Sequence, residues 1–220
     1  MPIDLVIFDC DGVLVDSEPI ANETFATMLA GLGLQLTQAE MFEHFVGYSM
    51  THCLRVVEQM LGRAPPSNFL EELQSRTYAA FRERLQPIDG IHYALDHLGV
   101  PFCVASSGDH DKMKTTLGIT GLLPRFEGRL FSVTQVARGK PAPDIYLFAA
   151  ERCGVRPDRC VVVEDTPPGV RGAVAAGMTV FGYCAHTPMD KLVAAGAHHL
   201  VSDMRDVPDL VAELSPRATV

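Results

Sequence analysis

The sequence predicts an α/β fold, in which a doubly wound parallel sheet carries an inserted helical cap domain. Short apolar runs rich in β-branched residues recur along the chain, and helical patterns separate the later ones. A long interval after the first run contains helical patterns only. The runs that we interpret as strands are 5–8, 101–105, 129–133, 160–163, 179–183 and 199–202.

The helical patterns between the later strands are typical of crossover connections in a Rossmann-like parallel sheet. They cover 90–98, 110–117, 143–153 and 169–176. The interval before the second strand is far longer than the roughly dozen residues that a crossover needs. Its helical patterns cover 18–32, 37–45, 50–62 and 68–85. We therefore expect a core domain of residues 1–16 and 87–220, and a helical cap domain of residues 17–86 over the strand ends.

Charge and composition exclude several classes of partner. The chain has 220 residues and a net charge of −9, without a cluster of lysine and arginine. Nucleic acid and anionic membranes are therefore not expected as partners, and we expect a monomer or a weak dimer that binds a small metabolite. An acidic protein can still bind a phosphate ester in a locally electropositive pocket, so its few lysines deserve inspection: Lys112, Lys114, Lys140 and Lys191.

The cysteines and the N-terminus indicate an ordinary cytoplasmic protein. No Cys-x-x-Cys pair occurs, and we interpret the cysteines as small buried hydrophobic residues rather than zinc ligands or disulfides. The first strand begins within a few residues of Met1, which leaves no room for a signal peptide. No apolar run approaches membrane-spanning length. The cysteines are Cys10, Cys53, Cys103, Cys153, Cys160 and Cys184.

Two carboxylates follow the first predicted strand. Asp9 and Asp11 come directly after the apolar run 5–8, at the end of the strand where open α/β sheets bind ligands. Alternate residues of an extended segment point the same way, so both can share one site, and Gly12 allows a sharp turn after them. Two acids this close repel each other unless a cation lies between them, and an all-oxygen site suits Mg²⁺.

An isolated Asp-x-Asp is more often a turn or a solvated loop. A calcium-binding loop would need glycine at its sixth position and glutamate at its twelfth, whereas Gly12 stands at the fourth. The calcium loop is therefore excluded, and the catalytic interpretation depends on matching features elsewhere in the chain.

Three further polar features follow predicted strands. Ser106, with Ser107 behind it, precedes a helix whose N-terminal amides can bind an anion, although a serine there is most often only a helix cap. Lys140 lies between glycine and proline, just before a helix. The N-terminus of a helix is already positive and gains nothing from a nearby cation. This position therefore favours a lysine with a specific function over an ordinary surface lysine. Glu164 and Asp165 end a continuous apolar strand, and helix capping is their main alternative role.

Together these residues supply the parts that phosphoryl transfer requires: a carboxylate nucleophile, an acid/base, a cation, a hydroxyl and a metal site. Catalysis of this reaction consists mainly of charge neutralisation and in-line positioning. A carboxylate can attack a phosphoryl group only if Mg²⁺ and Lys140 offset the repulsion between the two anions.

Along its whole length the chain resembles the haloacid dehalogenase (HAD) superfamily hydrolases, in the β-phosphoglucomutase-like group with a helical (C1-type) cap inserted after the first motif. The motifs that carry the resemblance are 9–18, 104–107, 139–144, 164–166 with Gly169, and 176–178.

The resemblance implies a role for each motif. Asp9 would be the nucleophile and a metal ligand. Asp11 would be the general acid/base, with its backbone carbonyl on Mg²⁺. Asp165 would be a further metal ligand, with Glu164 supporting the metal from beside it. The residues that would hold the phosphoryl oxygens are Ser106, with Ser107 next to it, and Lys140.

Within the superfamily, Asp11 argues for phosphate esters, because dehalogenases need no acid to protonate a leaving alkoxide. Phosphonatases share a lysine in their cap, whereas this chain has no lysine before Lys112. The phosphonatases are therefore excluded. β-Phosphoglucomutases carry a histidine, an arginine and a lysine where this chain has Ala21, Met50 and Asp109. We therefore expect a phosphatase of sugar phosphates or phosphosugar acids such as 6-phosphogluconate, with the mutase as the alternative.

Specificity is expected to come from the cap. Its polar candidates are Glu18, Asn22, Tyr48, His52 and Arg76, although residues of this kind are more often simply part of an exposed helix face. Arg76 is favoured among them because a guanidinium binds carboxylate or phosphate through two hydrogen bonds.

A receiver-like switch uses similar chemistry to hold an aspartyl-phosphate and is the non-enzyme alternative. Receiver domains are shorter, lack a cap and place their acid pair on adjacent residues, whereas Asp11 is two residues after Asp9. A binding module without catalysis is the other non-enzyme possibility, and the intact set of chemical residues argues against it.

Overall fold

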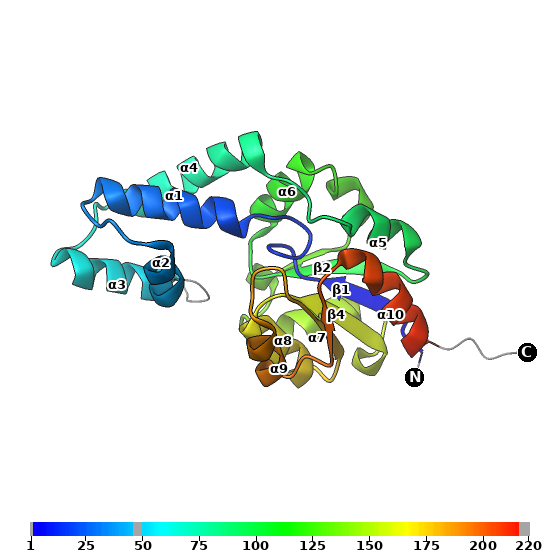
Figure 1. Ribbon diagram of the computed structural model, residues 1–220. Coiled ribbons are helices and arrows are strands. Elements are labelled where there is room, and N and C mark those ends of the chain that lie inside the picture. The colour runs from blue at the N-terminus through cyan, green and yellow to red at the C-terminus, as the bar shows by residue number, and fades with distance from the viewer. Residues whose placement is uncertain (1, 46–49, 216–220) are drawn as a thin grey trace, which may run out of the picture. The chain divides into compact units, whose positions relative to one another are not determined.

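The computed structural model describes residues 2–45 and 50–215, and Figure 1 shows its helices and strands. The chain divides into two compact units, which are described separately. One unit comprises Met1–Asp16 with Gln86–Val220, and the other comprises Ser17–Leu85.

The first unit is built on a six-stranded sheet in which every neighbouring pair is parallel. The strand order is β3-β2-β1-β4-β5-β6. The strands are β1 (Leu5–Phe8), β2 (Phe102–Ser106), β3 (Leu130–Ser132), β4 (Cys160–Glu164), β5 (Thr179–Tyr183) and β6 (His199–Val201). This arrangement confirms the predicted α/β fold with a doubly wound parallel sheet, and β1 lies in its middle between β2 and β4.

Helices cover both faces of this sheet (Figure 1). The helices are α5 (Ile91–His97), α6 (His110–Ile119), α7 (Asp144–Arg152), α8 (Pro167–Ala175), α9 (Met189–Ala195) and α10 (Val207–Leu214). One face packs against α7, α8 and α9, where alternate strand residues such as Leu5, Ile7 and Val162 are fully buried. The opposite face is covered by α5, α6 and α10. Strands with both faces buried explain why their sequences are continuous apolar runs.

Two of these helices, α9 and α10, are absent from the sequence-based prediction. They have seven and eight residues. Because α5 also has seven residues and was predicted, length alone does not explain why they were missed.

The second unit contains α1 (Glu18–Gly31), α2 (Gln38–Phe45), α3 (Met50–Leu61) and α4 (Phe69–Arg84). It has an apolar core of its own, which includes Phe25, Leu29, Val57 and Leu73. Its function as a cap over the strand ends stays a prediction. Across the described part of the chain, no helix combines the length and the apolar character needed to cross a membrane.

Candidate active site

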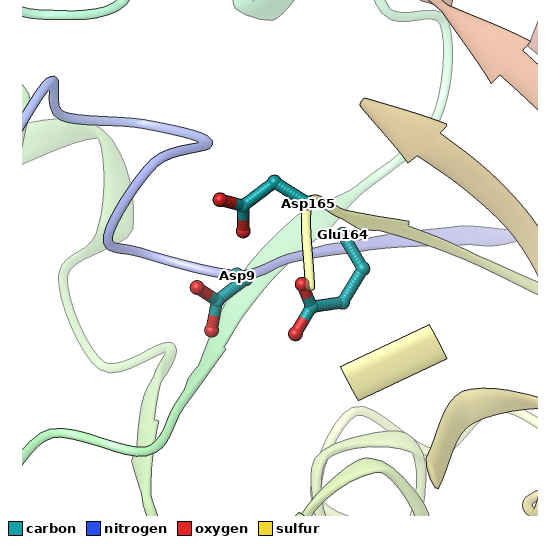
Figure 2. A group of neighbouring side chains, drawn as sticks. All are labelled: Asp9, Glu164 and Asp165. Carbon is teal, nitrogen blue, oxygen red and sulfur yellow. The ribbon is translucent and has the colours of Figure 1, made fainter. Parts of the chain in front are cut away.

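The site begins where β1 and β4 end side by side. Phe8 is paired with Val163 in the sheet, and the backbone N–H of Asp9 donates to the carbonyl of Val163 at 3.0 Å. The chain therefore leaves β1 with Asp9 next to Glu164 and Asp165. Figure 2 shows the three side chains gathered at these strand ends.

The three carboxylates form a buried acidic cluster. Asp9 is 6% exposed, while Glu164 and Asp165 are each 1% exposed. One carboxylate oxygen from each residue lies within 4.8 Å of the others. Like charges at this separation repel strongly in a poorly solvated environment. An all-oxygen donor set that needs positive charge fits a hard divalent cation.

Lys140 supplies one positive charge to this cluster. Its Nζ donates to Asp9 Oδ1 at 2.5 Å and to Glu164 Oε1 at 3.0 Å, and its side chain is 5% exposed. Burial alone would lower the pKa of Lys140, but the Asp9 and Glu164 carboxylates hold it well above its usual value. The ammonium also lies 5.1 Å from the centre of the Tyr146 ring. Lys140 is therefore a fixed cation in the site.

The surroundings of Asp9 shift the pKa of its carboxyl group strongly. Burial raises the pKa of Asp9 to about 7, although the Lys140 ammonium opposes this shift. Burial therefore works against the ionised form of Asp9, and Lys140 works in its favour. Additional positive charge beside Asp9 would favour it.

Asp11 lies outside the group of three acids and has a different cation. Lys112 Nζ donates to Asp11 Oδ2 at 2.7 Å, and the two side chains are 35% and 23% exposed. Burial opposes the charge on Lys112, but Asp11 raises the pKa of Lys112 above its usual value. The sequence analysis named Lys112 only as one of few lysines. Lys112 is therefore a residue beside Asp11 that the motifs did not reveal.

Ser106 is buried at the end of β2, with 1% exposure. Its Oγ accepts the backbone N–H of Gly108 at 2.9 Å, which leaves the hydroxyl hydrogen to be donated. The cap of α6 is Asp109, whose side chain accepts the N–H of Lys112 at 2.7 Å. Capping is thus not the role of Ser106, and Ser107 is exposed.

The capping alternative is also excluded for Glu164 and Asp165. Thr166 is the N-cap of α8, and its side chain accepts the N–H of Gly169 at 3.2 Å. Glu164 instead accepts from Lys140, from the Tyr146 hydroxyl at 3.4 Å and from the Thr166 N–H at 2.9 Å. Glu164 therefore fixes Lys140 in place.

Two glycines make room for the acids. Gly12 has a φ of +78°, which side chains rarely adopt, and a Cβ there would overlap Asp165 Oδ2. A Cβ at Gly169 would overlap Glu164 Oε1. Because Glu164 is held by several hydrogen bonds, it cannot move aside without disturbing Lys140.

Replacing Gly169 with alanine should therefore destabilise the protein, by about 1–3 kcal/mol for overpacking. Alanine at a helix position is otherwise stabilising. Gly118→Ala in α6 is a matched control, because the nearest neighbouring atom to a Cβ added at Gly118 is 4.0 Å away. Thermal unfolding should show a lower Tm for Gly169→Ala and an unchanged or higher Tm for Gly118→Ala. A higher Tm for both variants would show that Glu164 is free to move.

The helical unit holds the predicted specificity residues. Glu18 opens α1 and is half-buried, as are Asn22 and His52, whereas Tyr48 lies outside the described residues. Arg76 is exposed, and its Nε donates to Glu72 Oε1 at 3.1 Å one turn earlier in α4. This pairing is typical of a solvated helix face, and a role of Arg76 in substrate binding stays a prediction.

Comparisons with known proteins agree with the site. A family model described as haloacid dehalogenase-like hydrolase matches residues 3–177. The chain is 31% identical to 6-phosphogluconate phosphatase of Escherichia coli (strain K12), covering 94% of each chain. It is 32% identical to hexitol phosphatase A of the same organism, covering 84% of this chain and 85% of the relative.

Among solved structures, a HAD family hydrolase from Deinococcus radiodurans R1 with bound phosphate and sodium superposes with a TM-score of 0.83. The two are 33% identical, with 99% of each chain covered. The match of the family model across most of the chain, together with relatives above 30% identity over most of their length, shows the family. The chain therefore belongs to the haloacid dehalogenase-like hydrolases, in the branch whose members are phosphatases of phosphorylated metabolites.

Proposed function

We propose that this chain is a Mg²⁺-dependent phosphomonoester hydrolase that works through an aspartyl-phosphate on Asp9. Its substrate is a sugar phosphate or a phosphosugar acid such as 6-phosphogluconate. The observation that carries the proposal is the buried Asp9 carboxylate, held 2.5 Å from the Lys140 ammonium beside two further acids. A receiver-like switch is set aside because the chain belongs to a family of hydrolases.

The formal charges of the site support a divalent cation. Asp9, Asp11, Glu164 and Asp165 contribute four negative charges, and their two lysine partners contribute two positive ones. The remaining double negative charge is what Mg²⁺ would neutralise. Asp9, Asp165 and the Asp11 backbone carbonyl would hold the ion, with Glu164 beside them, and the bound ion would lower the repulsion between Asp9 and the phosphoryl group.

The residues of the chain then divide the reaction among them. An Asp9 oxygen attacks phosphorus in line with the leaving oxygen, while Lys140 and Ser106 bind the phosphoryl oxygens. Asp11 donates a proton to the leaving alkoxide. In the second step Asp11 removes a proton from water, which attacks the aspartyl-phosphate and releases phosphate from Asp9.

The substrate class is inferred from the relatives named above, which act on 6-phosphogluconate and on hexitol phosphates by their names. We propose that residues 17–86 form the cap that selects among such substrates, with Glu18 and Arg76 as candidates. We propose a cytoplasmic location for the enzyme, as the sequence analysis expects.

A phosphate-release assay tests this proposal. The purified protein, incubated with Mg²⁺, should hydrolyse p-nitrophenyl phosphate and several members of a panel of sugar phosphates that includes 6-phosphogluconate. EDTA should abolish the activity, and added Mg²⁺ should restore it. A protein that hydrolyses none of these compounds, or is indifferent to EDTA, would contradict the proposal.

The same assay separates a phosphatase from a mutase. Ala21, Met50 and Asp109 stand where mutases carry basic side chains, and Asp109 caps α6 instead. With β-glucose 1-phosphate and a trace of β-glucose 1,6-bisphosphate, we expect free phosphate to form faster than glucose 6-phosphate. Rapid isomerisation without phosphate release would assign the chain to the mutases.

A further inference from the structure

Lys112 lies in the active site without a role in the chemistry proposed above. Its Nζ donates to Asp11 Oδ2 at 2.7 Å from the first turn of α6, 101 residues further along the chain. Holding a long, flexible side chain in one position costs rotamer entropy, and partly exposed ion pairs return little stability. That Lys112 is nevertheless held in one position indicates a function for its side chain.

The local structure around Lys112 fixes the path of its side chain. Asp109 accepts the Lys112 backbone N–H at 2.7 Å, which sets the start of α6. A Cβ at Gly108 would lie 3.3 Å from both Lys112 Cδ and Ser106 Oγ. The absent side chain at Gly108 therefore leaves room for the lysine stem on one side and for the serine that is proposed to bind phosphate on the other.

The two lysines of the site serve different carboxylates. Lys140 bonds to Asp9 and Glu164, while Lys112 bonds to Asp11. A carboxylate with one oxygen bound by a fixed cation loses rotational freedom, and this is the requirement for a group that must meet a leaving oxygen in one geometry.

We propose that Lys112 is a positioning residue for Asp11. By binding Oδ2, it keeps the Asp11 carboxyl group in the orientation from which it reaches the leaving oxygen of the substrate. This inference rests on the proposed function, in which Asp11 is the general acid. It differs from substrate binding by Lys112, which would act on affinity instead of turnover.

Lys112→Met tests the inference, because methionine keeps much of the volume of the lysine stem and removes the charge. Lys114→Met is the matched control, since Lys114 is exposed on the same helix two residues later. Steady-state and stopped-flow kinetics are measured on p-nitrophenyl phosphate and on 6-phosphogluconate, or on the sugar phosphate of the panel that the wild type hydrolyses fastest.

For Lys112→Met we expect kcat on the sugar phosphate to fall about 10²-fold, as misplacement of a catalytic group does. On p-nitrophenyl phosphate, whose leaving group needs no proton, the burst of p-nitrophenol in a stopped-flow experiment should stay within a few-fold of the wild-type rate, while steady-state turnover falls because Asp11 also activates the water of the second step. KM should not rise on either substrate. Lys112→Arg should recover part of the loss, and Lys114→Met should behave as wild type. Adding Lys112→Met to Asp11→Asn should cost nothing further, because both variants remove the same function.

A raised KM with unchanged kcat would overturn the inference in favour of substrate binding. Equal slowing of the p-nitrophenol burst and of sugar phosphate cleavage, or full activity on both substrates, would also overturn it while the phosphatase activity of the wild type stands. An inactive wild type would refute the proposed function, and the inference with it. Thermal unfolding of each variant separates these results from a loss of folded protein.

Discussion

Replacing Asp9 with asparagine is expected to abolish phosphatase activity while the protein stays folded. The amide is nearly the same size as the carboxylate, but it is a poor nucleophile and a poor ligand for a hard cation. The replacement also removes the charge of one of three buried acids, whose carboxylate oxygens lie within 4.8 Å of one another. We expect kcat to fall by about 10⁴-fold or more, the scale of losses when an enzyme loses its nucleophile.

Asp4→Asn provides the control for this variant. Asp4 immediately precedes β1 and forms an ion pair with Arg159 outside the acidic cluster, so its replacement should leave activity unchanged. Circular dichroism and thermal unfolding should show both variants folded. Activity of Asp9→Asn within tenfold of wild type would refute the assignment of Asp9 as the nucleophile.

The central strands of the sheet could be predicted closely from the sequence because they are buried on both faces. Continuous apolar runs marked these strands, and the run 5–8 coincides with β1. The edge strand β6 is mostly exposed, and its run 199–202 begins with histidine and ends with serine. The short helices α9 and α10 escaped prediction, although α5, which is no longer than either, was predicted.

The acidic cluster could be predicted for a related reason. Parallel strands bring their carboxyl ends to the same edge, so acids that follow β1 and β4 must meet there. Lys140 was identified by its place between glycine and proline. Its bonds to both Asp9 and Glu164, however, depend on how the loop before α7 folds, and the sequence alone does not contain that geometry.

Lys112 shows what sequence motifs leave out. Its position in the chain looks like any first-turn helix residue, and the comparison with mutases directed attention to Asp109 instead. Only the packing reveals that Asp109 caps the helix and that the stem of Lys112 passes Gly108 to reach Asp11. A side chain recruited from a different strand–helix connection has no sequence pattern that relates it to its partner.

Asp11→Asn should separate proton donation from every other function of the site. The amide keeps the backbone carbonyl that is proposed to bind the metal, and it removes the proton that a leaving alkoxide needs. We expect kcat on a sugar phosphate to fall about 10²–10⁴-fold, the usual contribution of general acid catalysis.

The loss on p-nitrophenyl phosphate should be much smaller in the first step, because p-nitrophenolate leaves without a proton. Slow hydrolysis of the aspartyl-phosphate would then limit turnover, since Asp11 also activates the water. A burst of p-nitrophenol, equal in amount to the enzyme and followed by slow release of phosphate, is therefore the expected signature in a stopped-flow experiment. If Asp11→Asn slows the burst on p-nitrophenyl phosphate as much as it slows cleavage of the sugar phosphate, Asp11 is not the general acid and its carboxylate serves to organise the site around Lys112.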